Sequence, residues 1–274
     1  MGFVDGLSQN GMKVVYNVIE GCAAREMVVN VHDNYRPTGT ERSYPNLLTV
    51  EGIRGDEHNP DAQHATRLPF SRFLSGPADF TFVFRHPGET TNRNRTRAQQ
   101  LGLLVVYFSP LQHVLWYGKP FQYADREDQL EFIKRVPTTW DESIALNGKF
   151  GEYVTTARRS GDTWFVGTAT KNARTMPINL NFLDHATTYN VTTFEDDGNE
   201  GITKKNTLNI ISANQLTFNL LASGDTQINN VRAYALDGTI LGENPTLALP
   251  ASTSIVIVQV DTPKGRLTRK VLVK

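Results

Sequence analysis

The first half of the chain alternates helix-like apolar stripes with short runs of β-branched residues. Val14–Cys22 carries apolar residues at the helical period, and Met27–Val31 is an apolar run too short for a helix. A second such run, Leu47–Val50, follows a Pro- and Gly-containing loop. Leu101–Phe108 predicts a nearly continuous apolar helix, and Glu131–Val136 predicts one more strand. This alternation is typical of βα units built on parallel strands.

The pattern changes after Gly151, where short alternating strands are separated by polar turns. Such spacing predicts an antiparallel β-sandwich, so the expected fold class is α/β followed by all-β. The expected strands are Tyr153–Arg158, Thr163–Thr168, Ile178–Phe182, Tyr189–Phe194, Leu208–Ile211 and Leu216–Leu221.

Ionisable side chains stand where the first two predicted strands end. His32 and Asp33 follow the first strand, Glu51 follows the second directly, and Glu57 comes after two further glycines. Barrels of the β/α type place their chemistry at the C-terminal ends of strands, so this pattern predicts a catalytic rim. A complete eight-stranded barrel takes about 200 residues or more, and we count only about four or five strands before residue 148. The sequence therefore predicts the later half of a barrel.

The composition limits the classes of binding partner that this chain is expected to have. Lys plus Arg and Asp plus Glu number 28 each, so a net charge of zero argues against a nucleic acid or an anionic membrane as partner. No apolar run is long enough to span a bilayer, and the residues after Met1 do not have the pattern of a signal peptide. Cys22 is the single cysteine, which excludes an intrachain disulfide and favours packing within the first helix.

One block, HDNYRPTGTERSYPNLLTVEGIRGDE, resembles the signature of glycoside hydrolase family 97, the α-glucosidases and α-galactosidases of polysaccharide-degrading bacteria. The resemblance continues through HATRLPFSRFLSGPADFT, AQQLGLLVVYFSPLQ, FIKRVPTTWDES and GEYVTTARRSGDTWFVG, and so covers roughly residues 1 to 200. It implies that 1–148 is the C-terminal half of a (β/α)8 catalytic barrel, 149–228 a β-sandwich and 229–274 a β-rich tail.

The same resemblance implies catalytic roles. Glu57 matches the family's general acid and Asp33 the base of its inverting members, and glycoside hydrolysis requires such a carboxyl pair. Retaining members carry a nucleophilic aspartate at the position of Gly2, for which Asp5 is the nearest substitute. We therefore expect an inverting α-glucosidase acting on oligosaccharides, weakly active or inactive as this chain alone. A retaining α-galactosidase and a non-catalytic carbohydrate-binding protein are the alternatives.

A calcium ion is implied in the same way. In the family, the positions of Asp33, Glu51 and Glu57 hold calcium, and oxygen-only ligands suit this hard cation. A further ligand of the family lies in an N-terminal domain outside this sequence. His32 matches a residue that contacts the sugar, although a lone histidine after a strand is more often structural. Arg54 could orient Glu51 or Glu57, and a structural ion pair explains it equally well.

The final stretch resembles part of a type IX secretion sorting domain. Val256–Val260, the hairpin DTPKGR and the terminus RKVLVK carry that resemblance. It implies contact with secretion machinery and a periplasmic, secreted or cell-surface location. The alternative is that these residues are closing strands of the sandwich.

Overall fold

The protein was analysed as a computed structural model. It describes residues 1–3, 5–33, 35–84, 95–116, 118–124, 127–174, 178, 180–184, 189–196, 202–210, 215–217, 230–234, 240–243, 246–248, 255–262 and 265–272. Contacts divide the chain into two compact units. Unit 1 is Met1–Pro177 with Phe194–Thr203, and unit 2 is Ile178–Thr193 with Lys204–Lys274. The domain boundaries expected at 148 and 228 stay predictions.

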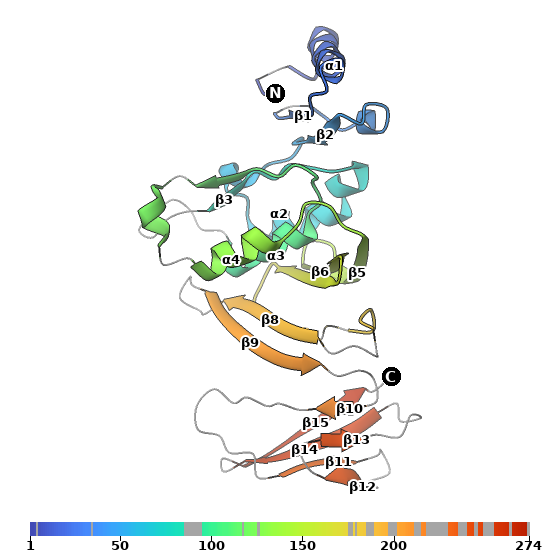
Figure 1. Ribbon diagram of the computed structural model, residues 1–274, viewed down its shortest axis with the longest axis vertical. Coiled ribbons are helices and arrows are strands. Elements are labelled where there is room, and N and C mark those ends of the chain that lie inside the picture. Colours follow the sequence, from blue (N-terminus) through green and yellow to red (C-terminus); the bar gives the residue numbers. More distant parts are fainter. Residues whose placement is uncertain are drawn as a thin grey trace. The chain divides into compact units, whose positions relative to one another are not determined.

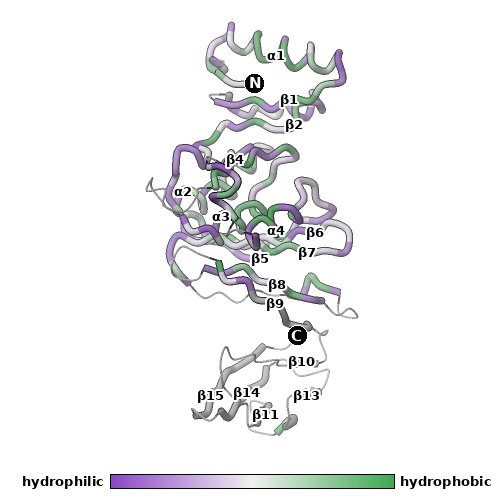
Figure 2. The backbone as a smooth tube through the Cα atoms, turned by 60° about the vertical axis from the view of Figure 1, so that its left-hand side comes forward, coloured by the Kyte–Doolittle hydropathy of each residue, from purple (hydrophilic) through white to green (hydrophobic). Residues whose placement is uncertain are grey.

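Unit 1 begins with a helix that covers two parallel strands. Helix α1 is Gln9–Ala23, strand β1 is Val29–Val31 and strand β2 is Leu47–Val50, and α1 lies beside both strands in two views (Figures 1 and 2). Val15 and Ile19 are fully buried against the strands, which confirms the predicted helix and both predicted strands. The buried cluster comprises Val15, Ile19, Val29, Val31, Tyr35, Leu47 and Val50.

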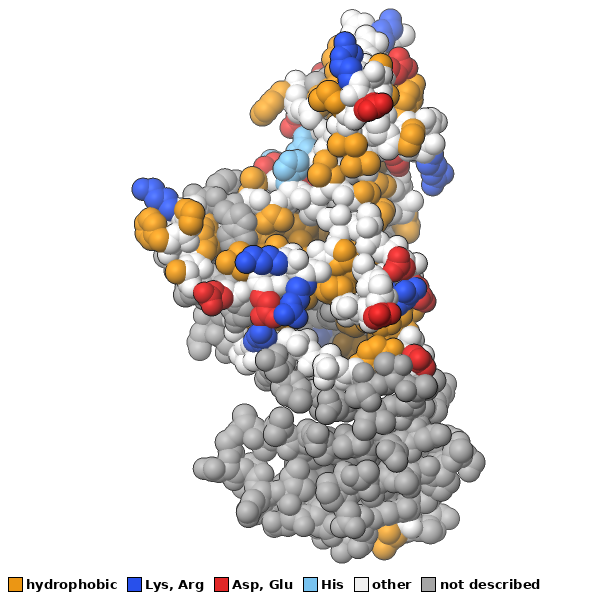
Figure 3. Space-filling view, in the orientation of Figure 1, with side chains coloured by type: hydrophobic (Ala, Val, Ile, Leu, Met, Phe, Trp, Pro, Cys, Tyr) orange, Lys and Arg blue, Asp and Glu red, His pale blue; other side chains and the backbone are white. Residues whose placement is uncertain are grey.

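Several apolar residues of this region face solvent. Val14 is 48% exposed and Val28 is 57% exposed, so the helix stripe is narrower than predicted and β1 begins two residues later than Met27. Figure 3 shows apolar side chains on the surface of this N-terminal part. The burial of α1 is therefore one-sided.

A second core surrounds a second parallel pair. Strand β3 (Phe82–Phe84) pairs with β4 (Val114–Trp116), and helices α2 (Ala62–Arg67) and α3 (Arg97–Val106) pack beside them. The helix predicted from Leu101 is confirmed, and Thr96 caps it by accepting a hydrogen bond from the Gln99 amide. Short 3-10 turns lie between the elements: η1 (Thr40–Arg42), η2 (Asp56–His58), η3 (Leu68–Phe70), η4 (Arg72–Ser75) and η5 (Pro120–Tyr123).

The strand predicted over Glu131–Val136 is wrong, because Glu127–Arg135 forms helix α4. Phe132 and Ile133 pack on the second core, while Glu131 and Arg135 form an i,i+4 ion pair on the outside. Basic residues also complete the last turn, where they oppose the negative end of the helix dipole. The apolar run was too short to reveal the helical period.

A sheet of three antiparallel strands lies in the same unit, and its second and third strands pack on α3. The three strands are β5 (Glu142–Lys149), β6 (Tyr153–Ser160) and β7 (Thr163–Thr170), and the last two confirm predicted strands. Strand β5 escaped prediction because it is mostly polar and partly exposed.

Two glycines allow α3 and β7 to approach closely. A Cβ atom at Gly102 would lie 2.5 Å from the Thr168 carbonyl oxygen, and one at Gly167 would lie 2.7 Å from Cβ of Val105. Neither position has room for a side chain. The helix therefore lies almost directly on the strand backbone.

Unit 2 is built from antiparallel strands, and its boundary with unit 1 passes through β8 (Tyr189–Asp196) and β9 (Ile202–Ile210). The remaining strands are β10 (Gln215–Thr217), β11 (Asn230–Tyr234), β12 (Ile240–Glu243), β13 (Thr246–Ala248), β14 (Ile255–Thr262) and β15 (Gly265–Leu272). Four of them form a sheet in the order β12-β11-β14-β15.

The expectations for unit 2 are confirmed in part. An antiparallel region follows the α/β region, and the hairpin predicted at DTPKGR joins β14 to β15, with Thr262 opposite Gly265. The described residues of Ile178–Phe182 do not form the expected strand. Ile211 and residues 218–221 of two expected strands lie outside the described residues. The sandwich and the barrel remain interpretations of these sheets.

Substituting Gly167→Ala should destabilise unit 1. The added methyl group meets the backbone of α3 and the Val105 side chain, and overpacking of this kind costs about 1–3 kcal/mol. Urea unfolding monitored by circular dichroism measures the change. Gly21→Ala in α1 is the matched control, because its nearest neighbour would be Arg25 at 3.8 Å and alanine favours helices. Equal stability of the two variants would contradict the close α3–β7 contact.

Candidate active site

Asp33 and Glu51 lie next to each other at the C-terminal ends of β1 and β2. The Glu51 amide donates to the Val31 carbonyl oxygen at 2.7 Å, which extends the parallel pairing by one residue. The Asp33 amide in turn donates to Oε2 of Glu51 at 2.6 Å. The two acids that sequence reasoning placed at strand ends are thus neighbours in the structure.

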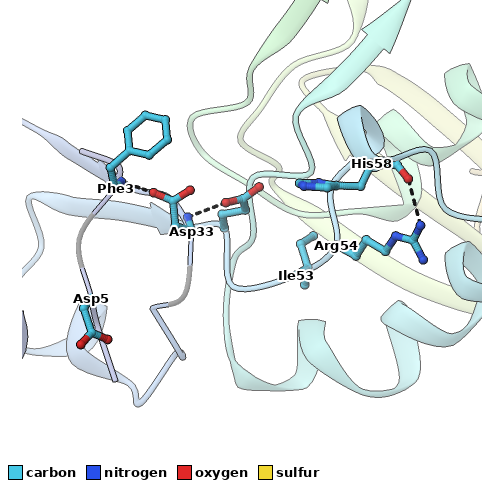
Figure 4. A pocket seen from close by; sticks show the side chains of 7 residues that line it. Phe3, Asp5, Asp33, Ile53, Arg54 and His58 are labelled. Carbon is cyan, nitrogen blue, oxygen red and sulfur yellow. Dashed lines mark hydrogen bonds between the residues drawn. The ribbon is translucent and has the colours of Figure 1, made fainter. Parts of the chain in front are cut away.

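Both acids line one open pocket of about 690 Å³ (Figure 4). Asp33 has a left-handed backbone, with φ of 71°, a conformation that aspartate tolerates better than most residues. Its Oδ2 atom accepts a hydrogen bond from the Phe3 amide. Arg54 donates to the His58 carbonyl oxygen at 3.1 Å, which favours its structural interpretation. The lining residues are Phe3, Asp5, Asp33, Glu51, Ile53, Arg54 and His58.

Glu51 has the electrostatic character of a functional acid. It is only 3% exposed, and burial raises the pKa of its carboxyl group. The Asp33 amide and the His32 ring oppose that rise, whereas the charges of Glu57 and Asp33 add to it. A buried carboxyl group with a raised pKa beside a pocket is a candidate for holding a proton.

Glu57 lies in a different environment from the one that its expected role requires. It belongs to the 3-10 turn η2, its side chain is 36% exposed, and its Oε1 atom lies 3.6 Å from Nδ1 of His58. It is near enough to raise the pKa of Glu51 but does not line the pocket. A general acid needs a raised pKa, which burial provides, and here the buried carboxyl group is that of Glu51.

The expected calcium ligands do not form one coordination site. Among the described residues, the group of three metal-ligating side chains within 4.8 Å of one another is His32, Asp79 and His113. Asp33 and Glu51 offer suitable oxygens, but one oxygen of each already accepts a backbone N–H. As arranged, Asp33, Glu51 and Glu57 do not fit calcium, so no chemical step is assigned to that ion.

Asp79 and His113 are site residues that sequence reasoning missed. Asp79 is fully buried just before β3, and His113 lies just before β4. His32 Nε2 is 2.8 Å from Oδ2 of Asp79, and His113 Nδ1 contacts the same oxygen. The one available signal was an aspartate enclosed by apolar residues in GPADFTF, since unpaired aspartate is almost never fully buried.

Burial alone would raise the pKa of Asp79, but its hydrogen bonds outweigh that effect. Donors on His32, His113 and Asn30 bring the pKa of this carboxyl group far below its ordinary value. The hydrogen bond to Asp79 raises the pKa of His32, although burial opposes it. His32 Nδ1 lies 3.6 Å from Oε2 of Glu51. His32 therefore links the buried aspartate to the pocket.

Two family models match the chain. The model described as "Glycoside hydrolase 97" matches residues 1–53, and the one described as "Glycosyl-hydrolase 97 C-terminal, oligomerisation" matches residues 139–229. A retaining alpha-galactosidase of Bacteroides thetaiotaomicron is 35% identical over 214 residues, which cover 72% of this chain and 32% of the relative. This chain belongs to glycoside hydrolase family 97. The resemblance found in the sequence is thereby confirmed for the C-terminal portion of the family.

Two further comparisons support the assignment. A probable retaining alpha-galactosidase of Streptomyces bingchenggensis is 36% identical over 166 residues, covering 60% of this chain and 26% of the relative. A family 97 enzyme of Pseudoalteromonas sp. strain K8, solved in complex with panose, has the same fold, with a TM-score of 0.51 at 23% identity. That alignment covers 94% of this chain and 35% of the solved one.

This chain covers only about a third or less of the length of each of these three relatives. Within the part that the structure describes, no helix has the length and apolar character needed to cross a membrane. The secretion tail and the location expected from it stay predictions.

Substituting Asp79→Asn should destabilise the protein by about 1.5–3 kcal/mol at pH 7, the range for hydrogen bonds to charged groups. The pKa of Asp79 is lower in the folded state than its ordinary value of 3.8, so its contribution is complete above that pH and declines as pH falls below it. Urea unfolding of both proteins between pH 7 and pH 2 measures the difference. A difference that grew on acidification would contradict an ionised Asp79.

Proposed function

We propose that this chain supplies part of the active site of an α-galactosidase. The observation that carries the proposal is the identity of 35% over 214 residues to a protein named as a retaining alpha-galactosidase. The inverting α-glucosidase expected from sequence is the second candidate. The panose complex, at 23% identity, supports the fold and does not bear on the sugar.

The general acid in this proposal is Glu57. Glu57 matches the position of the family's general acid. Its neighbour His58 lines the same pocket as Asp33 and Glu51. Glycosidic cleavage needs a proton at the leaving oxygen and a second carboxylate at the anomeric carbon or at a water molecule. Glu51, buried and next to Asp33, would hold the second group in place through its hydrogen bond with the Asp33 amide.

The second carboxylate is Asp33. A Cβ atom at Gly2 would lie 3.1 Å from Oδ2 of Asp33, so Asp33 stands beside the position where retaining members carry their nucleophile. Asp5 lines the same pocket, but its Oδ1 atom accepts the amide of Leu7 at 3.1 Å as part of a local turn. In a retaining reaction Asp33 would attack the anomeric carbon, and in an inverting one it would deprotonate water.

Gly2 is the observation that favours the inverting candidate, because it carries no carboxylate. The two outcomes differ in the first anomer released. Proton NMR of the early products of α-galactoside hydrolysis therefore separates them: α-galactose indicates retention and β-galactose indicates inversion.

In this proposal calcium would only stabilise the protein, and it would need ligands in addition to Asp33, Glu51 and Glu57. The oxygen donors of Asp33, Glu51 and Glu57 match its chemistry, but their positions do not make one coordination sphere. Thermal melting with calcium chloride or EDTA tests this point.

Substituting Glu57→Gln in the complete gene product that carries this chain should lower kcat/KM for an α-galactoside with an alkyl leaving group by about 10²–10⁴-fold. The effect should be much smaller for p-nitrophenyl α-galactoside, whose leaving group needs little protonation. Glu152→Gln, an exposed glutamate paired with Lys149 on the β5–β6 turn, is the matched control. Equal losses on both substrates would remove Glu57 from the role of acid.

Sugar preference is tested in the same preparation. The proposal predicts higher kcat/KM on p-nitrophenyl α-galactoside than on p-nitrophenyl α-glucoside. The opposite order would support the α-glucosidase candidate. Binding of galactose that survives Asp33→Asn and Glu57→Gln, without turnover of either substrate, would instead support a carbohydrate-binding protein.

A further inference from the structure

His32, Asp79 and His113 bring three potential metal ligands together behind the carboxylate pocket. Their ligand atoms all lie within 4.8 Å of one another, and they come from the end of β1, the start of β3 and the start of β4. We propose that these three side chains bind a divalent transition metal ion of the Zn²⁺ type. This site is distinct from the calcium ligands that the sequence predicts.

The two oxygens of Asp79 have different surroundings. Oδ1 accepts the amides of Thr81 and His113, at 3.1 and 3.0 Å, and the side chain of Gln112 at 2.6 Å. These donors fix the carboxylate plane. Oδ2 instead faces the ring nitrogens of both histidines. One oriented oxygen and two imidazole nitrogens thus converge, with the carboxylate held from behind by its other oxygen.

His32 is oriented as metal-bound histidines commonly are. Its Nε2 atom faces Asp79, while its Nδ1 atom lies 3.6 Å from Oε2 of Glu51. A metal ion on Nε2 requires a lone pair there, so the ring proton must sit on Nδ1, which faces the Glu51 carboxylate and would form a hydrogen bond with it after a small shift. A carboxylate that accepts the distal N–H of a ligating histidine fixes its tautomer and increases its basicity.

Asn30 provides a second, independent observation. This residue is 8% exposed, its Nδ2 atom lies 2.6 Å from Oδ2 of Asp79 and 3.2 Å from Nδ1 of His113, and its Oδ1 atom has no hydrogen-bond partner. The two ends of an amide are assigned from their neighbours. A cation bound by Asp79 and His113 would separate the two side chains, which now touch, and a rotated Asn30 would turn its unpaired oxygen to the ion as a fourth ligand.

The ligand set selects the class of ion. Imidazole nitrogen suits Zn²⁺, Ni²⁺, Co²⁺ and Cu²⁺, whereas Ca²⁺ takes six to eight oxygens. Two histidines, one aspartate and the Asn30 oxygen would complete the four-coordinate geometry that Zn²⁺ prefers. Access exists, because the side chains of His113 and His32 are 51% and 23% exposed.

Isothermal titration calorimetry of the EDTA-treated, dialysed chain with zinc chloride tests the proposal. We expect one Zn²⁺ per chain, with an affinity at least about tenfold lower in His113→Ala. His113 is half exposed, so this substitution should leave the fold intact, which circular dichroism checks. His58→Ala is the matched control, since its side chain is 61% exposed and lies outside the group of three.

The wild-type chain gives an answer that does not depend on any variant. Paramagnetic Co²⁺ should shift or broaden the imidazole proton signals of His32 and His113 far more than those of His58. Calcium chloride should not compete with zinc chloride at equal concentration. Equal zinc affinity in His113→Ala and His58→Ala, unchanged signals of His32 and His113, or preferential calcium binding would each overturn the proposal.

Discussion

The buried carboxylate of Asp79 holds the site of unit 1 together. An ionised group removed from water is costly unless it is paired and hydrogen-bonded, and Asp79 receives donors at both oxygens. These donors come from β1 through Asn30, from the end of that strand through His32, and from the segment before β4 through Gln112 and His113. The two parallel strand pairs are thereby joined by one charge, and the strand ends that carry the pocket are fixed by it.

The charge of Asp79 has consequences beyond its own contacts. Because His32 Nε2 lies 2.8 Å from Oδ2 of Asp79, its other ring nitrogen is turned toward Glu51. Glu51 accepts the Asp33 amide with the same oxygen, Oε2, that faces His32. A continuous set of polar contacts thus runs from the buried interior to the open pocket. Coupled polar networks of this kind stabilise only when every member is satisfied, which places strong demands on each residue.

Sequence patterns predicted the local parts of this arrangement. The ends of β1 and β2 were predicted because a short apolar run followed by a carboxylate needs no long-range information. The pairing of Asp79 with His32 and His113 was not predictable in this way, because it joins residues 47 and 34 positions apart. Helix α4 was predicted wrongly for a local reason. Its apolar residues form too short a run to distinguish the 3.6-residue period of a helix from the two-residue period of a strand.

The glycine at position 2 limits what the pocket can do. A Cβ atom there would lie 3.1 Å from Oδ2 of Asp33, closer than a neighbouring atom normally comes. A carboxylate at that position would therefore compete with Asp33 for the same space, and two like charges so close would raise the pKa of one of them. In the function proposed above, position 2 offers no second nucleophile, so the stereochemical course would depend on how far Asp33 reaches toward the anomeric carbon.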